Sequence, residues 1–280
     1  MIRQPRTAGW VDVDDKTYLA DCDRISNSML KTFLDWRPDF RDYYVLKTRR
    51  PDEPSASMWI GSAFHLLLLE PHKFDLTYVY PEDGKNYDRR TKEGKANWQE
   101  LSDSGREVIS LDDLKTIDGM RVASRRHEQL ITALNMEGGI RERAFFCEDE
   151  ATGLTLKGKP DLVLPNGIVV DIKTASDVSK DAWLNQARRL RYHMQAAFYL
   201  DCLSRFTKAK TFVHAVVGTY EPYPVVMYRL SERAVDLGRQ MYRSALQDLA
   251  DCIESDDWID PAEIGINEVD FPDWAYRSEV

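Results

Sequence analysis

The sequence predicts an α/β fold with a mixed central β-sheet flanked by helices and a helical N-terminal lobe. Three observations predict it. Apolar residues recur at helical spacing through much of residues 20–137, whereas short runs rich in Val, Ile and Phe begin after Gly138-Gly139. An Asn-Gly pair, Asn166-Gly167, separates two of these runs and is a strong hairpin signal. The later segments follow the order β-β-β-α-β-β-α, which is typical of a sheet covered by helices.

Three helices are expected in the N-terminal lobe, after an irregular or strand-like lead-in of about 20 residues. Ser26 is a suitable N-cap for the first helix, and Pro38 interrupts or ends it. The second covers about residues 57–70 and the third about residues 111–134, each with an apolar stripe. Residues 80–110 are polar and basic and contain glycines, so they predict a long loop with at most one helical turn.

The C-terminal half predicts a sheet built partly from hairpins. Pro165-Asn166-Gly167 supplies the turn between the second and third predicted strands. The runs that predict strands are residues 144–147, 154–164, 167–173, 211–219 and 225–230. The segments with helical periodicity are residues 180–204 and 231–253.

A chain of 280 residues is one large domain or two small ones, on a prior of roughly 150 residues per domain. We expect one domain over residues 1–250, with a helical lobe over about 20–137 and a core over about 138–250. Residues 251–280 then form an acidic tail with ten acidic residues and one basic residue. The net charge of −9 does not exclude nucleic acid, because the rest of the chain holds basic clusters and local patches decide phosphate binding.

The four cysteines lie far apart in the sequence and form no C-x-x-C pair. This argues against a zinc ribbon, an iron–sulfur cluster or a disulfide scaffold, and favours free thiols in a reducing cytosol. No apolar run approaches the roughly 18 residues that cross a bilayer, and the first residues lack the apolar segment of a signal peptide. A cytoplasmic protein without a membrane partner is therefore expected.

The most informative residues for function are Asp161, Asp171 and Lys173. Asp171 and Lys173 are alternate residues at the end of an apolar strand, so their side chains share one face of the sheet. Asp161 lies ten residues earlier, on the partner strand of the predicted hairpin. The isolated motifs are weak, since a D/E-x-K triplet occurs five times in the chain. Only the context of strand and hairpin distinguishes this one.

Two carboxylates that lie close together repel each other unless a cation holds them, and Mg²⁺ prefers oxygen ligands. A neighbouring lysine can then place or deprotonate a water molecule beside a phosphate. The arrangement thus favours phosphodiester hydrolysis. A surface hairpin with a simple Lys–Asp ion pair remains an alternative at this point.

Two further features fit the same chemistry. Tyr192, Gln195 and Tyr199 fall on one face of the predicted helix, which could lie over the sheet and face the metal. His65, at the edge of the apolar stripe of the second helix, could add a neutral imidazole ligand. The alternatives are a half-buried packing stripe for the first feature and a helix-edge histidine for the second.

Taken together, these motifs resemble the PD-(D/E)XK nuclease superfamily, and more closely its RecE-like branch, which contains exonuclease VIII and related phage exonucleases. The resemblance covers roughly residues 20–205 and implies a restriction-endonuclease-like core. The matching segments occur in the expected order, and they are Ile25–Leu30, Gly61–His65, Asp88–Lys95, Thr152-Gly153, Gly158–Asp161, Asp171–Thr174 and the Q-x-x-x-Y element Gln195–Tyr199.

The resemblance implies roles for the site residues. Asp161 and Asp171 would bind Mg²⁺, for which Mn²⁺ is an expected substitute, together with the backbone carbonyl of Ile172 and with His65. Lys173 would position the nucleophilic water. Gln195 and Tyr199 would orient Lys173, the water or the scissile phosphate. Glu142 would lie near the metal.

The resemblance also implies a substrate and partners. Members of the branch degrade linear double-stranded DNA from the 5′ end, form rings that thread the strand, and work beside a single-strand annealing protein in phage or prophage recombination within a bacterial host. Two sets of side chains are expected to contact DNA. The first set could line a channel and consists of Arg89, Arg90, Lys92 and Lys95. The second set lies at the start of the catalytic helix and just before it, and consists of Arg188, Arg189, Arg191 and Tyr192.

Three other functions remain open from the residues. One is a PD-(D/E)XK endonuclease. A second is a nuclease of the CRISPR-adaptation or AddB type, which carries a C-terminal cysteine cluster for iron–sulfur binding, whereas only Cys252 lies in that region here. The third is a catalytically silent module that binds DNA ends, for which paired carboxylates would have no use.

Overall fold

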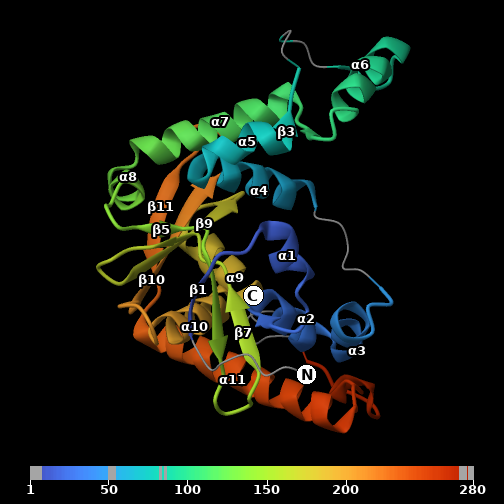
Figure 1. The fold of residues 1–280 in the computed structure, drawn as a ribbon, viewed down its shortest axis with the longest axis vertical. Helices are drawn as coiled ribbons and strands as arrows, with labels where there is room; N and C mark the ends of the chain where they lie inside the picture. The colour runs from blue at the N-terminus through green and yellow to red at the C-terminus, as the bar shows by residue number, and fades with distance from the viewer. Residues whose placement is uncertain (1–7, 50–54, 82–83, 85–86, 271–275, 277–280) are drawn as a thin grey trace.

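The computed structural model describes residues 8–49, 55–81, 84, 87–270 and 276. It confirms a mixed α/β fold, and Figure 1 shows the strands between an upper group of helices and a lower one. The predictions made for residues 1–7, and for most of 271–280, lie outside the described residues.

The strands of the core belong to two sheets rather than one. The five-stranded sheet has the order β11-β10-β9-β8-β5, and β9 and β10 are its parallel pair. Its strands are β5 (Ile140–Arg141), β8 (Leu162–Val163), β9 (Ile168–Ala175), β10 (Thr211–Gly218) and β11 (Val225–Arg229). The four-stranded sheet has the order β1-β6-β7-β2. Its strands are β1 (Gly9–Val11), β2 (Ile25–Ser26), β6 (Ala144–Glu148) and β7 (Thr155–Gly158).

The single strand expected over residues 154–164 is therefore wrong. It divides into β7 and β8, which belong to different sheets, and residues 159–161 connect them. Pro160 lies in this connection, where its missing N–H costs no ladder hydrogen bond. Because of the break, Asp161 directly precedes β8, the strand that pairs with β9.

The helical lobe covers one face of the five-stranded sheet. Phe64 and Ile117 of the lobe share a hydrophobic cluster with Val170 and Ile172 of β9. The elements of the lobe are α4 (Ala56–Leu69), α5 (Pro71–Thr77), β3 (Tyr78–Val79), α6 (Lys92–Ser102), β4 (Glu107–Val108), α7 (Leu111–Arg126) and α8 (Glu128–Leu134).

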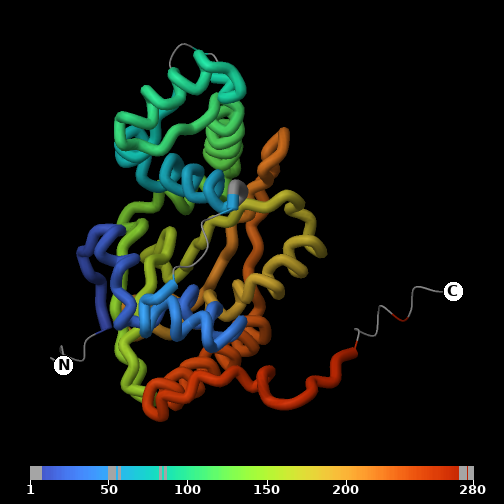
Figure 2. Tube along the Cα trace, turned by 90° about the vertical axis from the view of Figure 1, so that its right-hand side faces the viewer, coloured from blue at the N-terminus to red at the C-terminus, as the bar shows by residue number. Residues whose placement is uncertain are grey.

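Two expectations for this lobe are corrected. Residues 92–102, expected as loop, form α6, because Thr91 caps the helix by accepting a hydrogen bond from the Gly94 N–H at 2.9 Å. The third expected helix ends at Arg126, and His127 caps a new helix, α8, by accepting from the Leu130 N–H. In Figures 1 and 2, α6 forms an arm that projects beyond the rest of the lobe.

The N-terminal segment places α2 against the core. Ser26 caps α2 as expected and accepts a hydrogen bond from the Met29 N–H at 3.2 Å. Met29, Leu30 and Phe33 then form the buried face of the helix. The helices of this segment are α1 (Asp15–Ala20), α2 (Asn27–Asp35), α3 (Arg37–Phe40) and the π-helical η1 (Arg41–Val45).

The other face of the five-stranded sheet is covered by α9 (Lys180–Arg189) and α10 (Tyr192–Leu203). One helix was expected over residues 180–204, but it breaks at Arg191, whose φ is 53°. The new start at Tyr192 changes the direction of the chain before Gln195. Behind α10 packs α11 (Glu232–Ser255), close enough that a Cβ on Gly238 would lie 2.0 Å from the His193 carbonyl oxygen.

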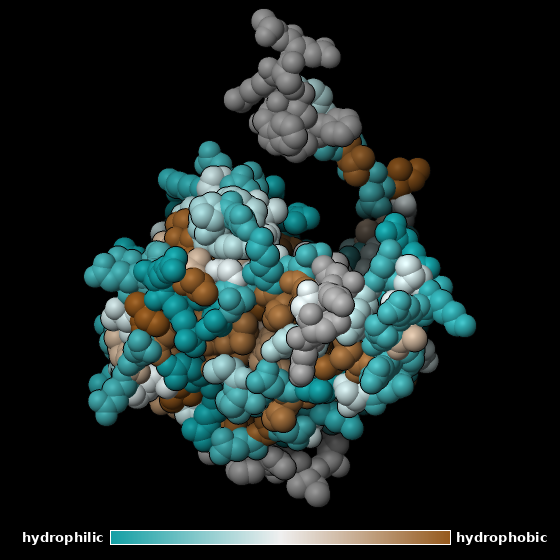
Figure 3. All heavy atoms as spheres, turned by 90° about the horizontal axis from the view of Figure 1, so that it is seen from above, coloured by the Kyte–Doolittle hydropathy of each residue, from teal (hydrophilic) through white to brown (hydrophobic). Residues whose placement is uncertain are grey.

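Part of the expected acidic tail packs against the body. Helix α11 continues to Ser255, and Trp258 is buried and stacks on Phe40 with ring centroids 5.9 Å apart. A short 3-10 helix, η2 (Pro261–Glu263), follows. Beyond it the chain extends away from the body in Figures 2 and 3, and Ile266 is fully exposed.

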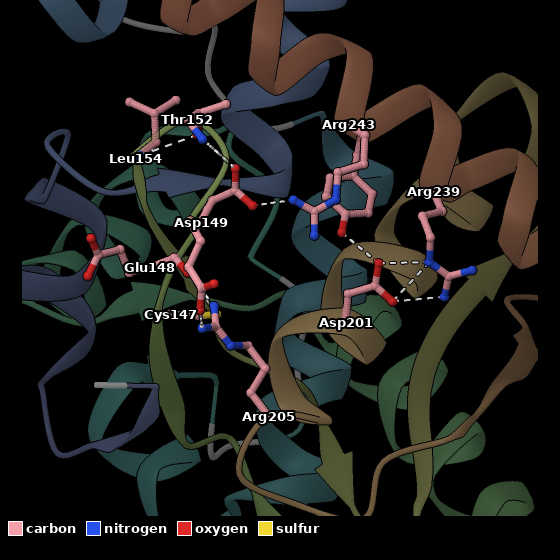
Figure 4. Close-up of polar contacts among 11 residues, drawn as sticks. Cys147, Glu148, Asp149, Thr152, Leu154, Asp201, Arg205, Arg239 and Arg243 are labelled. Carbon is pink, nitrogen blue, oxygen red and sulfur yellow. Dashed lines mark hydrogen bonds and ion pairs between the residues drawn. The ribbon is translucent and has the colours of Figure 1, made fainter. Parts of the chain in front are cut away.

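A polar network joins the middle of α11 to the C-terminal part of α10 and to the turn after β6. Asp201 of α10 accepts hydrogen bonds from Arg239 and from the Tyr242 hydroxyl, the latter at 2.6 Å (Figure 4). Arg243 pairs with Asp149 in the turn after β6.

Among the described helices, none is both long and apolar enough to cross a bilayer.

Candidate active site

The site lies where β8 and β9 meet the ends of α4 and α10. Leu162 pairs with Val170 in antiparallel register, so Asp161 and Asp171 are the next pair of opposite residues. Val169 and Ile172 are buried, which holds this part of β9 in the centre of the sheet. The hairpin thus brings the two predicted carboxylates onto neighbouring strands, as the sequence indicates.

Asp161 is fixed by the backbone of β9. Its Oδ2 accepts a hydrogen bond from the Ile172 N–H at 2.6 Å and lies 3.6 Å from Nδ1 of His65. Burial, together with the nearby charge of Asp171, raises the pKa of Asp161 to about 7. His65, on α4, also has a hydrogen bond to the Ile172 backbone, and burial lowers its pKa, which favours the neutral imidazole.

Glu142 follows β5 and lies beside Asp161. Its backbone has a φ of 45°, in the left-handed region. Burial, and then the charge of Asp161, raises the pKa of Glu142 to about 7. Lys159 offsets part of this repulsion, because its Nζ lies 3.1 Å from Oε2 of Glu142 and 2.6 Å from Oδ1 of Asp15 in α1.

His65, Glu142 and Asp161 can act together as ligands, since each offers an atom and these atoms all lie within 4.8 Å of one another. Two carboxylates and one imidazole suit a divalent cation. A cation would also offset the burial and the repulsion that raise the pKa values of both carboxylates. The donor set therefore fits a divalent metal ion.

Asp171 lies outside this trio of neighbouring ligand atoms, and its carboxylate contacts Lys173 and Gln195. Its Oδ2 lies 2.5 Å from Nζ of Lys173, and its Oδ1 accepts a hydrogen bond from Gln195 Nε2 at 3.1 Å. Burial alone would raise the pKa of Asp171, but Lys173 and His214 lower it below its usual value. Conversely, burial would lower the pKa of Lys173, but Asp171 and Asp161 raise it well above its usual value, so Lys173 is an ammonium ion at neutral pH.

The Q-x-x-x-Y element has two separate contacts, neither of them to Lys173. Gln195 contacts Asp171, whereas the Tyr199 hydroxyl donates to the Lys159 carbonyl oxygen at 3.4 Å. The Tyr199 ring packs edge-on against Phe145, with centroids 5.7 Å apart. Glycine at position 158 leaves room for both rings, because a Cβ there would come within 2.4 Å of the Phe145 ring and 2.9 Å of the Tyr199 ring. In this structure the element supports one carboxylate and the connection between β7 and β8.

The first predicted set of DNA-contacting residues does not meet the site. Arg89, Arg90, Lys92 and Lys95 lie on or just before α6, on the projecting arm (Figure 1). Arg89 stacks over Trp98 at 4.6 Å, and Arg90 pairs with Asp88. All four are exposed, so they form a basic surface at a distance from the carboxylates.

The second predicted set divides between surface and site. Arg188 and Arg189 are exposed at the end of α9. Arg191, in the break before α10, pairs with Asp35 of α2 at 2.6 Å. Tyr192 is buried against Trp183, and Nζ of Lys173 lies 5.0 Å from its ring centroid. Tyr192 therefore forms a wall beside the lysine.

The structure adds residues that sequence reasoning missed. His214 of β10 is the register partner of Asp171, and its Nε2 lies 3.8 Å from Asp171 Oδ2. It is fully buried, and neither ring nitrogen has a hydrogen bond within the part of the chain that the structure describes. Lys159 and Lys31 also lie beside the site. The parallel pairing of β9 and β10, which brings His214 here, has no local sequence signal.

One solved structure supports the fold, and a second match is weaker. A presumed exonuclease from Eubacterium rectale aligns with a TM-score of 0.63 and 14% identity, over 96% of this chain and 100% of the other. A phage related exonuclease from Haemophilus somnus aligns with a TM-score of 0.33 and 12% identity, over 59% of this chain and 84% of the other. The search of curated proteins found no match.

A family model matches residues 26–265, which span both the helical lobe and the core. Its description is "PDDEXK-like domain of unknown function" (DUF3799). The matched range contains the residues of the site described above except Asp15, the partner of Lys159. The chain belongs to this PDDEXK-like family, and it has a nuclease-like domain.

Proposed function

We propose that this protein is a Mg²⁺-dependent exodeoxyribonuclease that degrades linear double-stranded DNA in the 5′→3′ direction. The observation that supports it most is that the buried Asp161 and Asp171 lie with the half-buried Lys173, and that His65 and Glu142 are at hydrogen-bonding or metal-binding distances. A protein that only binds DNA has no need for an acidic cluster in which two carboxylates, those of Asp161 and Glu142, have raised pKa values.

Each residue has a role in the proposal. His65, Glu142 and Asp161 would hold the ion, with Asp171 and the Ile172 carbonyl completing its protein ligands. A bound Mg²⁺ or Mn²⁺ supplies positive charge against the phosphate and lowers the pKa of water. Lys173, as an ammonium ion, donates hydrogen bonds to the attacking water or the scissile phosphate, and is therefore a positioning group rather than a base. Gln195 orients Asp171, and Tyr199 holds the connection that presents Asp161.

Action on DNA ends and the biological setting rest on the resemblance to RecE-like nucleases and on the name of the Eubacterium rectale fold relative. We infer a cytoplasmic, phage- or prophage-encoded enzyme of a bacterial host that acts in homologous recombination. Its partners would be double-stranded DNA ends, further copies of itself in a ring, and a single-strand annealing protein. The division into a nuclease domain over residues 1–250 and an acidic tail belongs to the same proposal.

The experiment that tests the proposal is digestion of a linear duplex labelled at either the 5′ or the 3′ end, with Mg²⁺, with Mn²⁺ and with EDTA. Early release of the 5′ label as mononucleotides, only with metal, is the expected result. Early release of the 3′ label would overturn the polarity. Cleavage of covalently closed circles would instead identify an endonuclease, because an enzyme that needs ends leaves circles intact.

A further inference from the structure

Lys31 of α2 faces the same aromatic wall as the lysine of the site. Its Nζ lies 5.2 Å from the ring centroid of Tyr192, and Nζ of Lys173 lies 5.0 Å from the same centroid. The two lysines come from segments that are far apart in the sequence, α2 and β9. Tyr192 is held in place by its stack on Trp183, with centroids 5.3 Å apart.

Three cations gather around Tyr192, but they differ in their partners. Lys173 pairs with Asp171 at 2.5 Å, and Arg191 pairs with Asp35 at 2.6 Å. Among the described residues, Lys31 has no carboxylate within ion-pair distance, although it is half-buried. Lys31 is thus the cation of this group that lacks an anion.

Lys31 behaves as a partly buried positive charge that has no ion-pair partner among the described residues. Burial, and then the charge of Lys173, lowers the pKa of Lys31 to about 8; Asp171 and Asp35 oppose this only in part, and Arg191 adds to it. Such a group is costly to keep charged unless an anion binds beside it. A lysine that served only to cover Tyr192 could lie over the ring with its ammonium in water.

We propose that Lys31 is part of a second phosphate-binding subsite, in which it binds the DNA phosphate next to the one at Lys173. The inference rests on the proposed function for its substrate, but on separate residues. The ligand class is a phosphodiester of the nucleic-acid backbone, whose charge matches the missing anion. Arg191 lies beside it and can contribute once the exposed Asp35 yields to the phosphate.

The test measures binding without catalysis. Fluorescence anisotropy in EDTA gives the affinity for a labelled duplex of about 20 base pairs at several salt concentrations. Lys31→Met keeps the apolar stem and removes the charge; we expect about five- to tenfold weaker binding and a salt slope smaller by about one. Lys31→Arg should restore both quantities.

Lys115→Gln is the matched control, since Lys115 is also a helical lysine but pairs with Glu221 on the surface. It should bind as the wild type does. Wild-type affinity and salt slope for Lys31→Met would overturn the subsite, and a thermal melt of each variant confirms that it is folded. If the wild type binds the duplex through Lys31 but never hydrolyses it with Mg²⁺, the proposed function fails and the subsite survives.

Discussion

The charge state of Lys173 decides what this residue can do. Two carboxylates on neighbouring strands hold its pKa well above the usual value, so it does not accept a proton near neutral pH. It can still stabilise negative charge that develops on a phosphate, in a site largely removed from water. The same contacts explain why Asp171 keeps its charge in a buried strand.

Lys173→Ala should therefore lose cleavage without losing DNA binding. Removal of a single positioned donor costs about 100- to 1,000-fold in rate for comparable sites. Single-turnover cleavage of a labelled duplex with Mg²⁺ measures the loss, and anisotropy in EDTA checks that the variant still binds. A variant that cleaves at the wild-type rate would refute the role of this lysine.

Cys147 provides a pH-dependent contribution to stability away from the site. The hydrogen bond from Cys202 and the nearby Arg205 lower the pKa of Cys147 to about 7 in the folded state, from about 9 when exposed. When folding lowers the pKa of an acid, the charged acid stabilises the folded state. This contribution is complete above the pKa of the unfolded state and is lost as the pH falls through the pKa of the folded state. The free energy of unfolding of the wild type, relative to Cys147→Ser, should thus rise between pH 7 and 9.

Urea unfolding at each pH, in reducing buffer, measures this difference. Cys252→Ser is the matched control, because burial raises the pKa of Cys252. The difference in the free energy of unfolding between the wild type and this variant should not grow over the same pH range. A constant difference for Cys147→Ser would show that its thiolate is not stabilised.

Among the elements, α10 depends on α11 for its position, and Asp201 is the main polar contact between them (Figure 4). Arg239 and the buried Tyr242 hydroxyl both donate to its carboxylate. Without Asp201 that hydroxyl would lack its acceptor, and a buried unsatisfied group is costly. Since Gln195 lies on the same helix, this contact also supports the site indirectly.

Asp201→Ala should lower the free energy of unfolding by about 2–4 kcal/mol, because it removes several hydrogen bonds and leaves a buried group unpaired. Asp236→Ala serves for comparison, since Asp236 is largely exposed and, within the described part of the chain, forms its ion pair with Arg239. It should cost about 0–1 kcal/mol. Equal losses in urea titrations of the two variants would contradict the assigned importance of Asp201.

The elements also show which features could be predicted from the sequence. Local signals were sufficient for the Ser26 cap, the turn at Gly167 and the presence of Asp161 opposite Asp171. The division of residues 154–164 between two sheets and the break at Arg191 depend on partners far along the chain. For the same reason, Glu142 was expected near the metal from resemblance alone, and Lys31 and His214 were missed.

At the scale of the whole molecule, two groups of cations among the described residues bear on the proposed function, although the chain carries a net charge of −9. One group of cations lies around Tyr192 in the site, and the other is on the α6 arm, which projects from the helical lobe (Figures 1 and 2). Because the two groups are apart, a short duplex end can engage the first alone, whereas a longer duplex can reach both. The arm would then add affinity without changing the chemistry.

Lys92→Gln/Lys95→Gln tests this division of roles, since both lysines are exposed on α6. Each lost phosphate contact should lower the slope of log affinity against log salt by about 0.9, so the double variant should bind a long duplex several-fold more weakly at moderate salt. Its single-turnover cleavage rate at saturating DNA should equal that of the wild type. Lys208→Gln/Lys210→Gln, which removes two exposed lysines next to the Gly167 turn, is the matched control and should leave both quantities unchanged. If both double variants weaken binding equally, the arm has no specific role and only the total charge matters.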